Sequence, residues 1–363
     1  MKIEFYHVDA FEVANYEPIW RELKRKGVET NLVAVPGHQN TAAANWFDYA
    51  TFQAYCESRQ LPFTDKPDCT ATMGVTTQNA DILANYAYRV RLMYGPVIFP
   101  AAWALQAHAV KPFDVVLTHG RAYQERFMQW LTPEQLPIIG YPRYDDFFAG
   151  KLSRQKIREA WGLNEHRPVL AFLPTWDNNT GLDAFLPYLL QLADQYQIIL
   201  RPHHCTVRFE PERMEKLKAS GLLLLENAYD LAEVYAASDV VVSDVRSGGL
   251  FEACLCDIPT VGMVIDPHEI TGWLSHYHVD SMVSLCYQPD QLRQAIDIAL
   301  TSSTHAEHRK LWADQHVAFR DGTAAKEAAE ALIQLADKRL CKPVFSSAGL
   351  TSISMTATNL NNN

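Results

Sequence analysis

One short segment of the sequence combines the residue types that bind a phosphate. The apolar stretch DVVVSD ends at Asp244, and Ser247, Gly248 and Gly249 then open a predicted helix. Small residues let an anion approach the backbone, and the free N–H groups and dipole of a helix N-terminus favour negative charge. Glu252 lies one turn further along and could reach a ribose hydroxyl. A tight turn capped by its serine is the alternative, but the position after an apolar strand favours a phosphate site.

A second group of chemically active residues follows the apolar stretch QIIL. Arg201 supplies a fixed positive charge for a phosphate, and His203 and His204 come two and three residues later. A histidine can act as a general base or donate a hydrogen bond to a phosphate near neutral pH. A lone histidine is more often structural. Two adjacent histidines behind an arginine at a strand end favour a function for one of them.

Three further loops are expected to contribute, because ligands of open α/β sheets bind beyond the carboxyl ends of the strands. The loop PTWDNN contains Thr175, which offers a hydroxyl or simply forms part of a turn. His119 follows the strand DVVLT, and Arg143 lies in the segment GYPRYD. Both would line a cleft between two domains, although Arg143 could instead belong to a rigid connector and pair with a nearby acid.

Short β-rich segments alternate with amphipathic helical patterns along the chain. This alternation occurs twice and predicts an α/β protein with two doubly wound parallel sheets. The predicted strands are residues 2–8, 29–37, 114–120, 136–142, 168–175, 197–204, 221–227, 239–244 and 258–264. The predicted helices are residues 17–27, 41–60, 78–90, 121–131, 153–162, 184–196, 211–220, 230–238, 247–257, 290–300, 304–319 and 324–340.

The boundary between the two series is expected near residues 145–153. Residues 1–150 would then form an N-terminal Rossmann-like acceptor domain, and residues 151–323 a C-terminal Rossmann-like nucleotide-binding domain. A C-terminal helix at 324–342 would follow. The polar, low-complexity stretch at 343–363 is predicted to be a disordered tail.

Composition excludes several classes of protein. The chain of 363 residues is 48% hydrophobic and 20% charged, which is typical of well-cored globular domains. Its net charge of −10 argues against a general nucleic-acid binder, which normally shows a basic footprint. The seven irregularly spaced cysteines indicate free thiols in a reducing cytoplasm. The most apolar stretch, 94–110, contains two prolines and is too short for a membrane span, so it is predicted to be buried and is the candidate for lipid contact.

Four segments in fixed order resemble the CDP-glycerol glycerophosphotransferase family, which includes teichoic-acid polymerases. The resemblance covers residues 85–335 and rests on GYPRYD at 140–145, FLPTWDNN at 172–179, ILRPHH at 199–204 and YDLAEVYAASDVVVSDVRSGGLFEACLCDIPTV at 229–261. It implies a GT-B fold, in which two Rossmann-like domains face each other and a C-terminal helix packs back on the first. It also implies transfer of a polyol phosphate from a CDP-polyol to an acceptor hydroxyl, with release of CMP and no bound metal or cofactor.

The resemblance assigns roles to individual residues. The family's motif residues correspond here to Arg143, Thr175, His203, Asp244 and Ser247. Glu252 stands where the family usually has aspartate. The histidine of the family's W-H-G segment, a candidate catalytic base, corresponds to Tyr94, and His119 is the substitute base that the sequence offers.

The leading hypothesis is therefore phosphoryl transfer in cell-surface polymer synthesis. Arg143, Arg201 and the helix start would neutralise the diphosphate, Glu252 would hold the ribose, and His203 would stabilise the transferred phosphate or the leaving group. The partners would be a CDP-polyol donor and a glycan or lipid-linked acceptor at the inner face of the cell membrane. The segment SGGLFE also resembles UDP-sugar 2-epimerases and nucleotide-sugar glycosyltransferases, which are the first alternative. A non-catalytic nucleotide-binding member of the family is the second.

Overall fold

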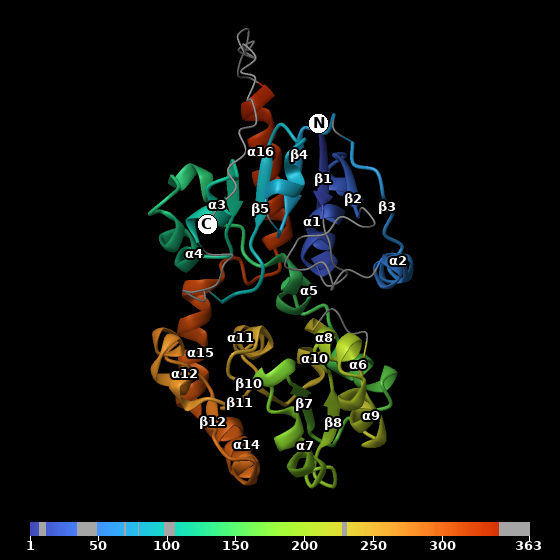
Figure 1. Ribbon diagram of the computed structural model, residues 1–363, viewed down its shortest axis with the longest axis vertical. Coiled ribbons are helices and arrows are strands. Elements are labelled where there is room, and N and C mark those ends of the chain that lie inside the picture. The colour runs from blue at the N-terminus through green and yellow to red at the C-terminus, as the bar shows by residue number, and fades with distance from the viewer. Residues whose placement is uncertain are drawn as a thin grey trace, which may run out of the picture.

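Two parallel sheets form the framework of the protein, one in each half of the chain (Figure 1). The computed structural model describes residues 1–6, 12–34, 49–68, 70–78, 80–97, 106–226 and 231–340. The first sheet contains β1 (Lys2–Tyr6), β2 (Glu29–Val33), β3 (Phe63–Thr64), β4 (Met73–Thr76), β5 (Arg89–Leu92) and β6 (Val115–Leu117). The second contains β7 (Val169–Leu173), β8 (Gln197–Leu200), β9 (Leu223–Leu224), β10 (Val240–Asp244), β11 (Thr260–Met263) and β12 (Ser284–Cys286).

The strand orders confirm the doubly wound topology that the sequence predicts. They are β3-β2-β1-β4-β5-β6 in the first sheet and β12-β11-β10-β7-β8-β9 in the second, and every pairing is parallel. Each sheet therefore reverses its direction of growth once, between β1 and β4 and between β7 and β10. In such sheets a ligand binds beyond the carboxyl ends of the strands at the point of reversal.

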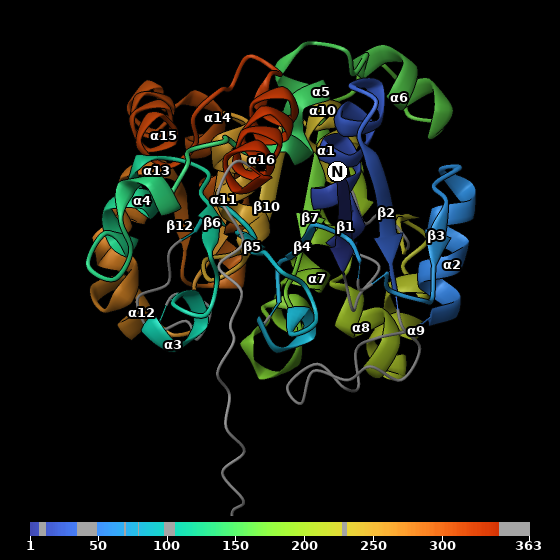
Figure 2. The ribbon, with the colours of Figure 1, turned by 90° about the horizontal axis from the view of Figure 1, so that it is seen from above.

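Helices cover both faces of each sheet (Figures 1 and 2). In the first half they are α1 (Val13–Arg25), α2 (Tyr49–Ser58), α3 (Ala107–Val110), α4 (Arg121–Phe127) and α5 (Asp145–Phe148). In the second half they are α6 (Arg154–Ala160), α7 (Leu182–Leu190), α8 (His204–Phe209), α9 (Pro211–Ala219), α10 (Ala232–Ala237), α11 (Gly248–Leu255), α12 (Pro267–Thr271), α13 (Val279–Met282), α14 (Leu292–Thr301), α15 (Ser303–His316) and α16 (Ala324–Leu340).

The second sheet is buried on both faces, as its apolar strands predict. Every residue of β7 and β10 is buried. Leu170 and Phe172 face the core that contains α7 and α14, whereas Ala171 and Leu173 face the core that contains α10 and α11. Because both faces are filled, only the strand ends remain to bind a ligand.

The last helix, α16, returns to the N-terminal half and packs on α1 (Figure 1). Its residues Ala328, Ala329 and Leu332 belong to the same core as β1 and β2. Residues 140–153 connect the two halves and are called the connector. Within it, the carboxylate of Asp145 accepts hydrogen bonds from the backbone N–H groups of Ala324 at 3.1 Å and Ala325 at 2.7 Å. The connector and the crossover helix are therefore joined at the helix N-terminus.

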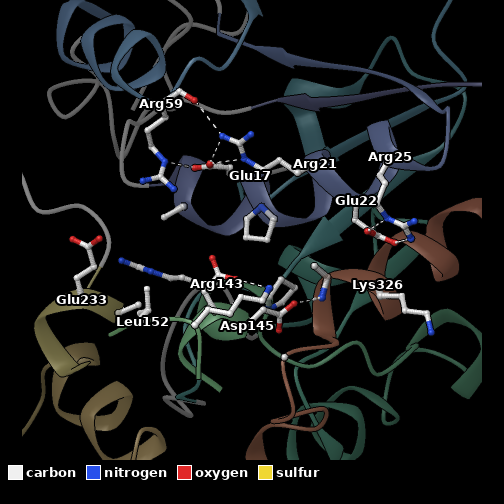
Figure 3. Close-up of a pocket in the computed structure, with 18 residues that line it drawn as sticks. Glu17, Arg21, Glu22, Arg25, Arg59, Arg143, Asp145, Leu152, Glu233 and Lys326 are labelled. Carbon is white, nitrogen blue, oxygen red and sulfur yellow. Dashed lines mark hydrogen bonds and ion pairs between the residues drawn. The ribbon is translucent and has the colours of Figure 1, made fainter. Parts of the chain in front are cut away.

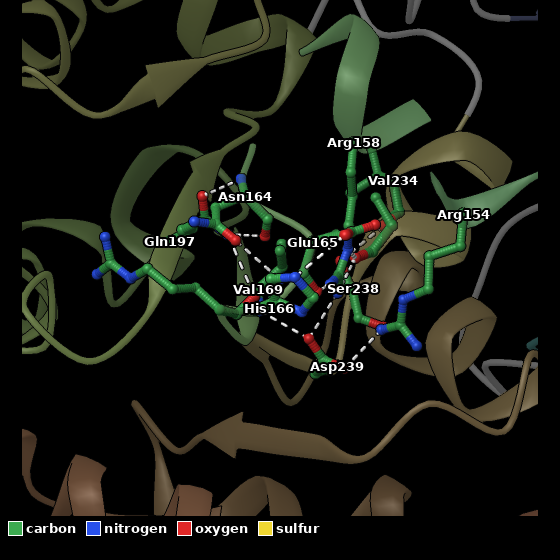
Figure 4. Close-up of polar contacts among 12 residues, drawn as sticks. Arg154, Arg158, Asn164, Glu165, His166, Val169, Gln197, Val234, Ser238 and Asp239 are labelled. Atoms are coloured by element: carbon green, nitrogen blue, oxygen red, sulfur yellow. Dashed lines mark hydrogen bonds and ion pairs between the residues drawn. The ribbon is translucent and has the colours of Figure 1, made fainter. Parts of the chain in front are cut away.

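A network around Asp239 joins the first helix of the second half to its sheet (Figure 4). The Asp239 carboxylate accepts hydrogen bonds from Arg154 and Arg158, each at 2.6 Å, and from the backbone N–H of Val169 at 2.7 Å. Ser153 caps the start of α6, as the sequence predicts, by accepting from Lys156 N at 3.4 Å. This network is structural, because it lies at the amino ends of β7 and β10.

The structure differs from the sequence prediction at several segments, most of them in the first half. The helix predicted at 78–90 is wrong, since this segment forms a 3₁₀ turn at Ala80–Leu83 and then strand β5. The strand predicted at 136–142 is reduced to an isolated bridge between Thr118 and Ile138. Strands β3, β4 and β12 were not predicted at all. The predicted tail at 343–363 lies outside the described part of the chain.

Among the described residues, no helix is long and apolar enough to cross a bilayer.

Strand β4 was missed because its packing depends on residues that follow it. A Cβ at Gly74 would lie 2.8 Å from the side chains of Leu83 and Tyr86. Glycine is therefore required where the 3₁₀ segment crosses the strand closely. Glycine lowers the strand propensity of a short segment, so the local sequence does not predict β4. The strand forms because of its packing in the folded protein.

Replacing Gly322 by alanine is expected to lower the Tm by several degrees more than replacing Gly150. Both glycines have positive φ, +84° and +66°, so alanine strains the backbone at each. A Cβ at Gly322 would also lie 2.6 Å from the Cβ of Ala149 and 2.8 Å from the carbonyl oxygen of Asp145, whereas a Cβ at Gly150 meets nothing within 4 Å. Overpacking of this kind costs about 1–3 kcal/mol. Thermal unfolding of the two variants measures the difference, and equal Tm values would contradict a close approach at the connector.

Candidate active site

A cavity of about 240 Å³ lies between the two halves at the switch point of the second sheet. The loops after β7, β8 and β10 form one side, and Tyr94 and Gly95 contribute from the N-terminal half. The residues that the sequence predicts and that line this cavity are Arg143, Thr175, Arg201, His203, Ser247, Gly248, Gly249 and Glu252. Asp244 and His119, the remaining two, are not among the lining residues. The strand ends thus bring together segments more than 100 residues apart.

The N-terminus of α11 is open toward the cavity. Ser247 caps the helix, since its Oγ accepts a hydrogen bond from Gly249 N at 3.2 Å. A Cβ at Gly248 would meet no atom within 4 Å. Protein packing therefore does not require glycine at this position, and its missing side chain leaves space at the helix start, where an anion binds favourably.

His203 is held in one tautomer by the backbone. As the N-cap of α8, its Nδ1 accepts a hydrogen bond from Cys205 N at 3.2 Å. The ring stacks on Trp176 with a centroid distance of 6.0 Å and an interplanar angle of 14°. Burial, His204 and Arg201 hold the pKa of His203 well below its usual value. The ring is therefore neutral, and its Nε2 carries the proton and can donate it in a hydrogen bond to a ligand.

Two arginines approach each other in the cavity. Arg201 and Arg143 both line it, and burial together with the Arg143 guanidinium lowers the pKa of Arg201. Arg143 is 7% exposed, and its Nη1 lies 3.8 Å from Oε1 of Glu252. Guanidinium groups bind phosphate through paired N–H donors, so the two arginines on one cavity suit an anionic ligand such as a diphosphate.

Asp244 has a structural task that its position in the sequence does not reveal. It is fully buried, and its two oxygens accept hydrogen bonds from the backbone N–H groups of Thr175 and Gly181, each at 2.7 Å. Burial raises the pKa of Asp244 to about 6. The carboxylate therefore shapes the loop that carries Thr175, and both of its oxygens bind backbone N–H groups rather than face the cavity as a phosphate contact.

His119 lies outside the cavity. Its side chain is fully buried, its ring packs against Tyr141 at a centroid distance of 4.4 Å, and its Nδ1 donates a hydrogen bond to the Gly140 carbonyl at 2.8 Å. Burial lowers the pKa of His119 to about 4. A base must come within hydrogen-bond reach of the proton that it removes. The geometry therefore does not support His119 as the substitute base, and Tyr94 occupies the cavity instead.

Sequence reasoning missed Arg246 and Tyr141. Arg246 lines the cavity, where its guanidinium lies 3.2 Å from the Glu269 carboxylate and also contacts Asn179. The Tyr141 hydroxyl donates a hydrogen bond to Glu252 Oε1 at 2.8 Å. The motifs around both residues were recognised, but nothing in a motif tells which of its side chains turns toward the cavity.

One group of described residues has the composition of a metal site. Ligand atoms of His203, His204 and Cys205 lie within 4.8 Å of one another. His203 Nδ1 already accepts a hydrogen bond from the backbone, and Cys205 is fully buried. A metal using Nδ1 would have to displace the cap of α8, so the geometry favours a hydrogen-bonding role for His203.

A second cavity, of about 610 Å³, lies on the other side of Arg143 (Figure 3). Its cations are mostly matched by acids: Glu17 accepts hydrogen bonds from Arg21 at 2.8 Å and Arg59 at 2.5 Å, and Glu22 pairs with Arg25 at 2.7 Å. These pairs leave the larger cavity less suited to a phosphate. The smaller cavity, with its helix N-terminus and its neutral histidine donor, is the better candidate for a phosphate site.

Two facing Rossmann-like domains, a cavity between them and a helix that crosses back from the second to the first define a protein of the GT-B class. A family model described as CDP-Glycerol:Poly(glycerophosphate) glycerophosphotransferase matches residues 118–334. The chain belongs to this family.

Comparison with individual proteins agrees with this assignment. The teichoic acid poly(glycerol phosphate) polymerase of Bacillus spizizenii is 30% identical over 122 residues, and the match covers 30% of this chain and 30% of that polymerase. A structure of the wall teichoic acid polymerase TagF with CDPG has a TM-score of 0.67 at 16% identity, covering 94% of this chain and 90% of that chain. The UDP-GlcNAc 2-epimerase of Neisseria meningitidis, bound to UDP-GlcNAc, has a TM-score of 0.58 at 11% identity, covering 92% and 100%. At these identities the two structures show a shared fold.

Proposed function

We propose that this protein transfers glycerol phosphate, or a related polyol phosphate, from a CDP-polyol to an acceptor hydroxyl and releases CMP. The observation that carries the proposal is the convergence of two guanidinium groups, a neutral histidine donor and an open helix N-terminus on one cavity at the strand ends. Family membership supplies the reaction class. The acceptor is a glycan or a lipid-linked chain, and the reaction serves cell-surface polymer synthesis.

The chemistry consists mainly of positioning and charge stabilisation. The acceptor hydroxyl oxygen forms a bond to the phosphorus that carries the polyol, its proton passes to the departing CMP phosphate or to solvent, and the bond from that phosphorus to the bridging oxygen breaks. CMP leaves with the bridging oxygen and its electron pair. Arg143, Arg201 and the N-terminus of α11 neutralise the diphosphate, while the Nε2–H of His203 stabilises charge on the transferred or leaving phosphate.

The reaction takes place in the cytoplasm at the inner face of the cell membrane. A net charge of −10 gives no general attraction to anionic lipids. Attachment to a membrane-borne acceptor therefore relies on the 94–110 segment or on a partner protein. Residues 98–105 of this segment lie outside the described part of the chain.

A ligand panel followed by a turnover assay tests the proposal. We expect CDP-glycerol or CDP-ribitol to raise the Tm more than UDP-N-acetylglucosamine or CMP-sialic acid, because a ligand at 100 times its Kd stabilises the native state by about 2.7 kcal/mol. The stabilising CDP-polyol is then incubated with an acceptor, and released CMP is measured. Stabilisation by the UDP-sugar alone would favour the nucleotide-sugar enzyme. Binding of a CDP-polyol without turnover on any acceptor would favour the non-catalytic alternative.

A further inference from the structure

A hydrogen bond between the two halves of the protein holds the carboxylate assigned to the ribose. The hydroxyl of Tyr141 donates to Oε1 of Glu252 at 2.8 Å, although the two residues are 111 positions apart. Tyr141 is 1% exposed and Glu252 is 6% exposed. Tyr141 precedes the 3₁₀ turn at Pro142–Tyr144, on the connector, whereas Glu252 lies on α11. The contact therefore forms only when α11 and the connector are docked together.

The tyrosine ring is fixed on both sides. It packs against the His119 ring at a centroid distance of 4.4 Å and against the Tyr144 ring at 5.2 Å. His119 is itself held by its hydrogen bond to the Gly140 carbonyl. The buried rings leave the Tyr141 hydroxyl little freedom, and a hydroxyl so placed orients the group that it binds. Its buried environment and the nearby carboxylate raise the pKa of Tyr141 well above its usual value, so it remains a donor.

The two oxygens of Glu252 have different surroundings. Oε1 accepts from Tyr141 and lies 3.8 Å from Arg143 Nη1. Within the described part of the chain Oε2 has no hydrogen-bond donor, and Glu252 lines the cavity. A carboxylate can accept about four hydrogen bonds. One oxygen is thus fixed by the protein while the other remains available for a ligand.

We propose that Tyr141 is a positioning residue that holds Glu252 so that its Oε2 accepts a hydrogen bond from a ribose hydroxyl of the nucleotide. This inference rests on the proposed function, because it needs a nucleotide in the cavity. It adds that recognition of the ribose depends on the connector as well as on the nucleotide-binding half. Removing the Tyr141 hydroxyl alone then weakens the binding of ribose and leaves the phosphate contacts of Arg143 and Arg201 in place.

The Tyr141→Phe variant tests the inference, and Tyr144→Phe is its matched control. Tyr144 is also fully buried, and its ring packs against the Tyr141 ring. Its hydroxyl, however, has no hydrogen-bond partner among the described residues. The probes are CMP and 2′,3′-dideoxy-CMP, which lacks both ribose hydroxyls, and Kd is measured by calorimetry. We expect the wild-type protein to prefer CMP roughly tenfold or more, since a hydrogen bond to a charged group is worth about 1.5–3 kcal/mol.

In Tyr141→Phe this preference is expected to fall toward one, while the Kd of the dideoxy analogue stays unchanged. Tyr144→Phe is expected to keep the wild-type preference. The inference is overturned if Tyr141→Phe keeps the full preference, or if it weakens both ligands equally. Wild-type protein that binds neither probe would instead contradict the proposed function.

Glu252→Gln provides a second route that does not depend on the stability of the tyrosine variant. It keeps the shape of the side chain and removes the charged acceptor, so the preference for CMP should again fall. In the Glu252→Gln background, Tyr141→Phe should cause no further loss of preference, because both changes act on one contact. Additive losses in the double variant would show that Tyr141 acts elsewhere.

Discussion

Replacing His203 by asparagine is expected to lower kcat for CMP release by about 10²–10³, the usual loss when one donor to a developing negative charge is removed. The Nε2–H of His203 disappears, but the asparagine oxygen can still accept the Cys205 N–H that His203 Nδ1 now binds at 3.2 Å. Asparagine is among the best N-cap residues. The Tm should therefore change little, so that the loss of rate reports on chemistry.

The His203→Ala variant separates the two tasks of this residue. It removes both the donor and the cap, so kcat should fall as far as in His203→Asn, while the Tm falls as well because a lost cap costs about 1 kcal/mol. The pKa of His203 is held well below its usual value. Protonation of His203 should therefore cause no change in the wild-type rate near pH 6.5. A His203→Asn variant with the wild-type kcat would show that the His203 side chain takes no part in the reaction.

The sequence was informative about which loops meet and much less about which side chains face the ligand. The carboxyl ends of parallel strands lie at one edge of a sheet, so the apolar strands before Thr175, Arg201 and Ser247 predict that the three loops converge. The structure places all three residues on one cavity. This part of the prediction follows from topology, which periodicity reveals.

Asp244 and His119 show where such reasoning ends. Asp244 ends β10 and His119 follows β6, positions where functional residues are expected, yet Asp244 accepts the N–H groups of Thr175 and Gly181, and His119 packs behind Tyr141. A polar residue after a strand can bind a ligand or satisfy the backbone of a neighbouring loop. The two tasks use the same residue types at the same position. Only the three-dimensional partners distinguish them.

The missed contact of Tyr141 has a different cause. Tyr141 and Glu252 belong to motifs that were both recognised, but their hydrogen bond depends on how two domains dock. Docking is set by contacts such as those of Asp145 with the start of α16. The periodicity predicts the last helix itself, but no local signal shows which residues it contacts. Interactions between domains are therefore the part of this site that a single sequence conceals.

Replacing Arg201 by methionine is expected to weaken the binding of a CDP-polyol by about 10² or more, because removal of one partner from a buried charge pair costs about 2–5 kcal/mol. In the ligand-free protein the same change should alter the Tm little. Burial and the Arg143 guanidinium disfavour the charged form of Arg201, as its lowered pKa indicates, and this cost offsets the contacts that the side chain makes, such as its hydrogen bond to the Pro202 carbonyl at 3.2 Å. Removing one of two like charges relieves a repulsion that the diphosphate otherwise compensates.

Arg201→Lys is the matched comparison for this prediction. Lysine keeps the charge but not the planar fork that binds phosphate in a bidentate manner, so its Kd should lie between those of the wild type and Arg201→Met, with no gain in Tm. Thermal unfolding with and without CDP-glycerol measures both quantities in one experiment. A methionine variant that loses stability and still binds the nucleotide would show that Arg201 holds the fold. A methionine variant that loses binding but keeps its stability would show that the Arg201 charge serves ligand binding and does not stabilise the ligand-free protein.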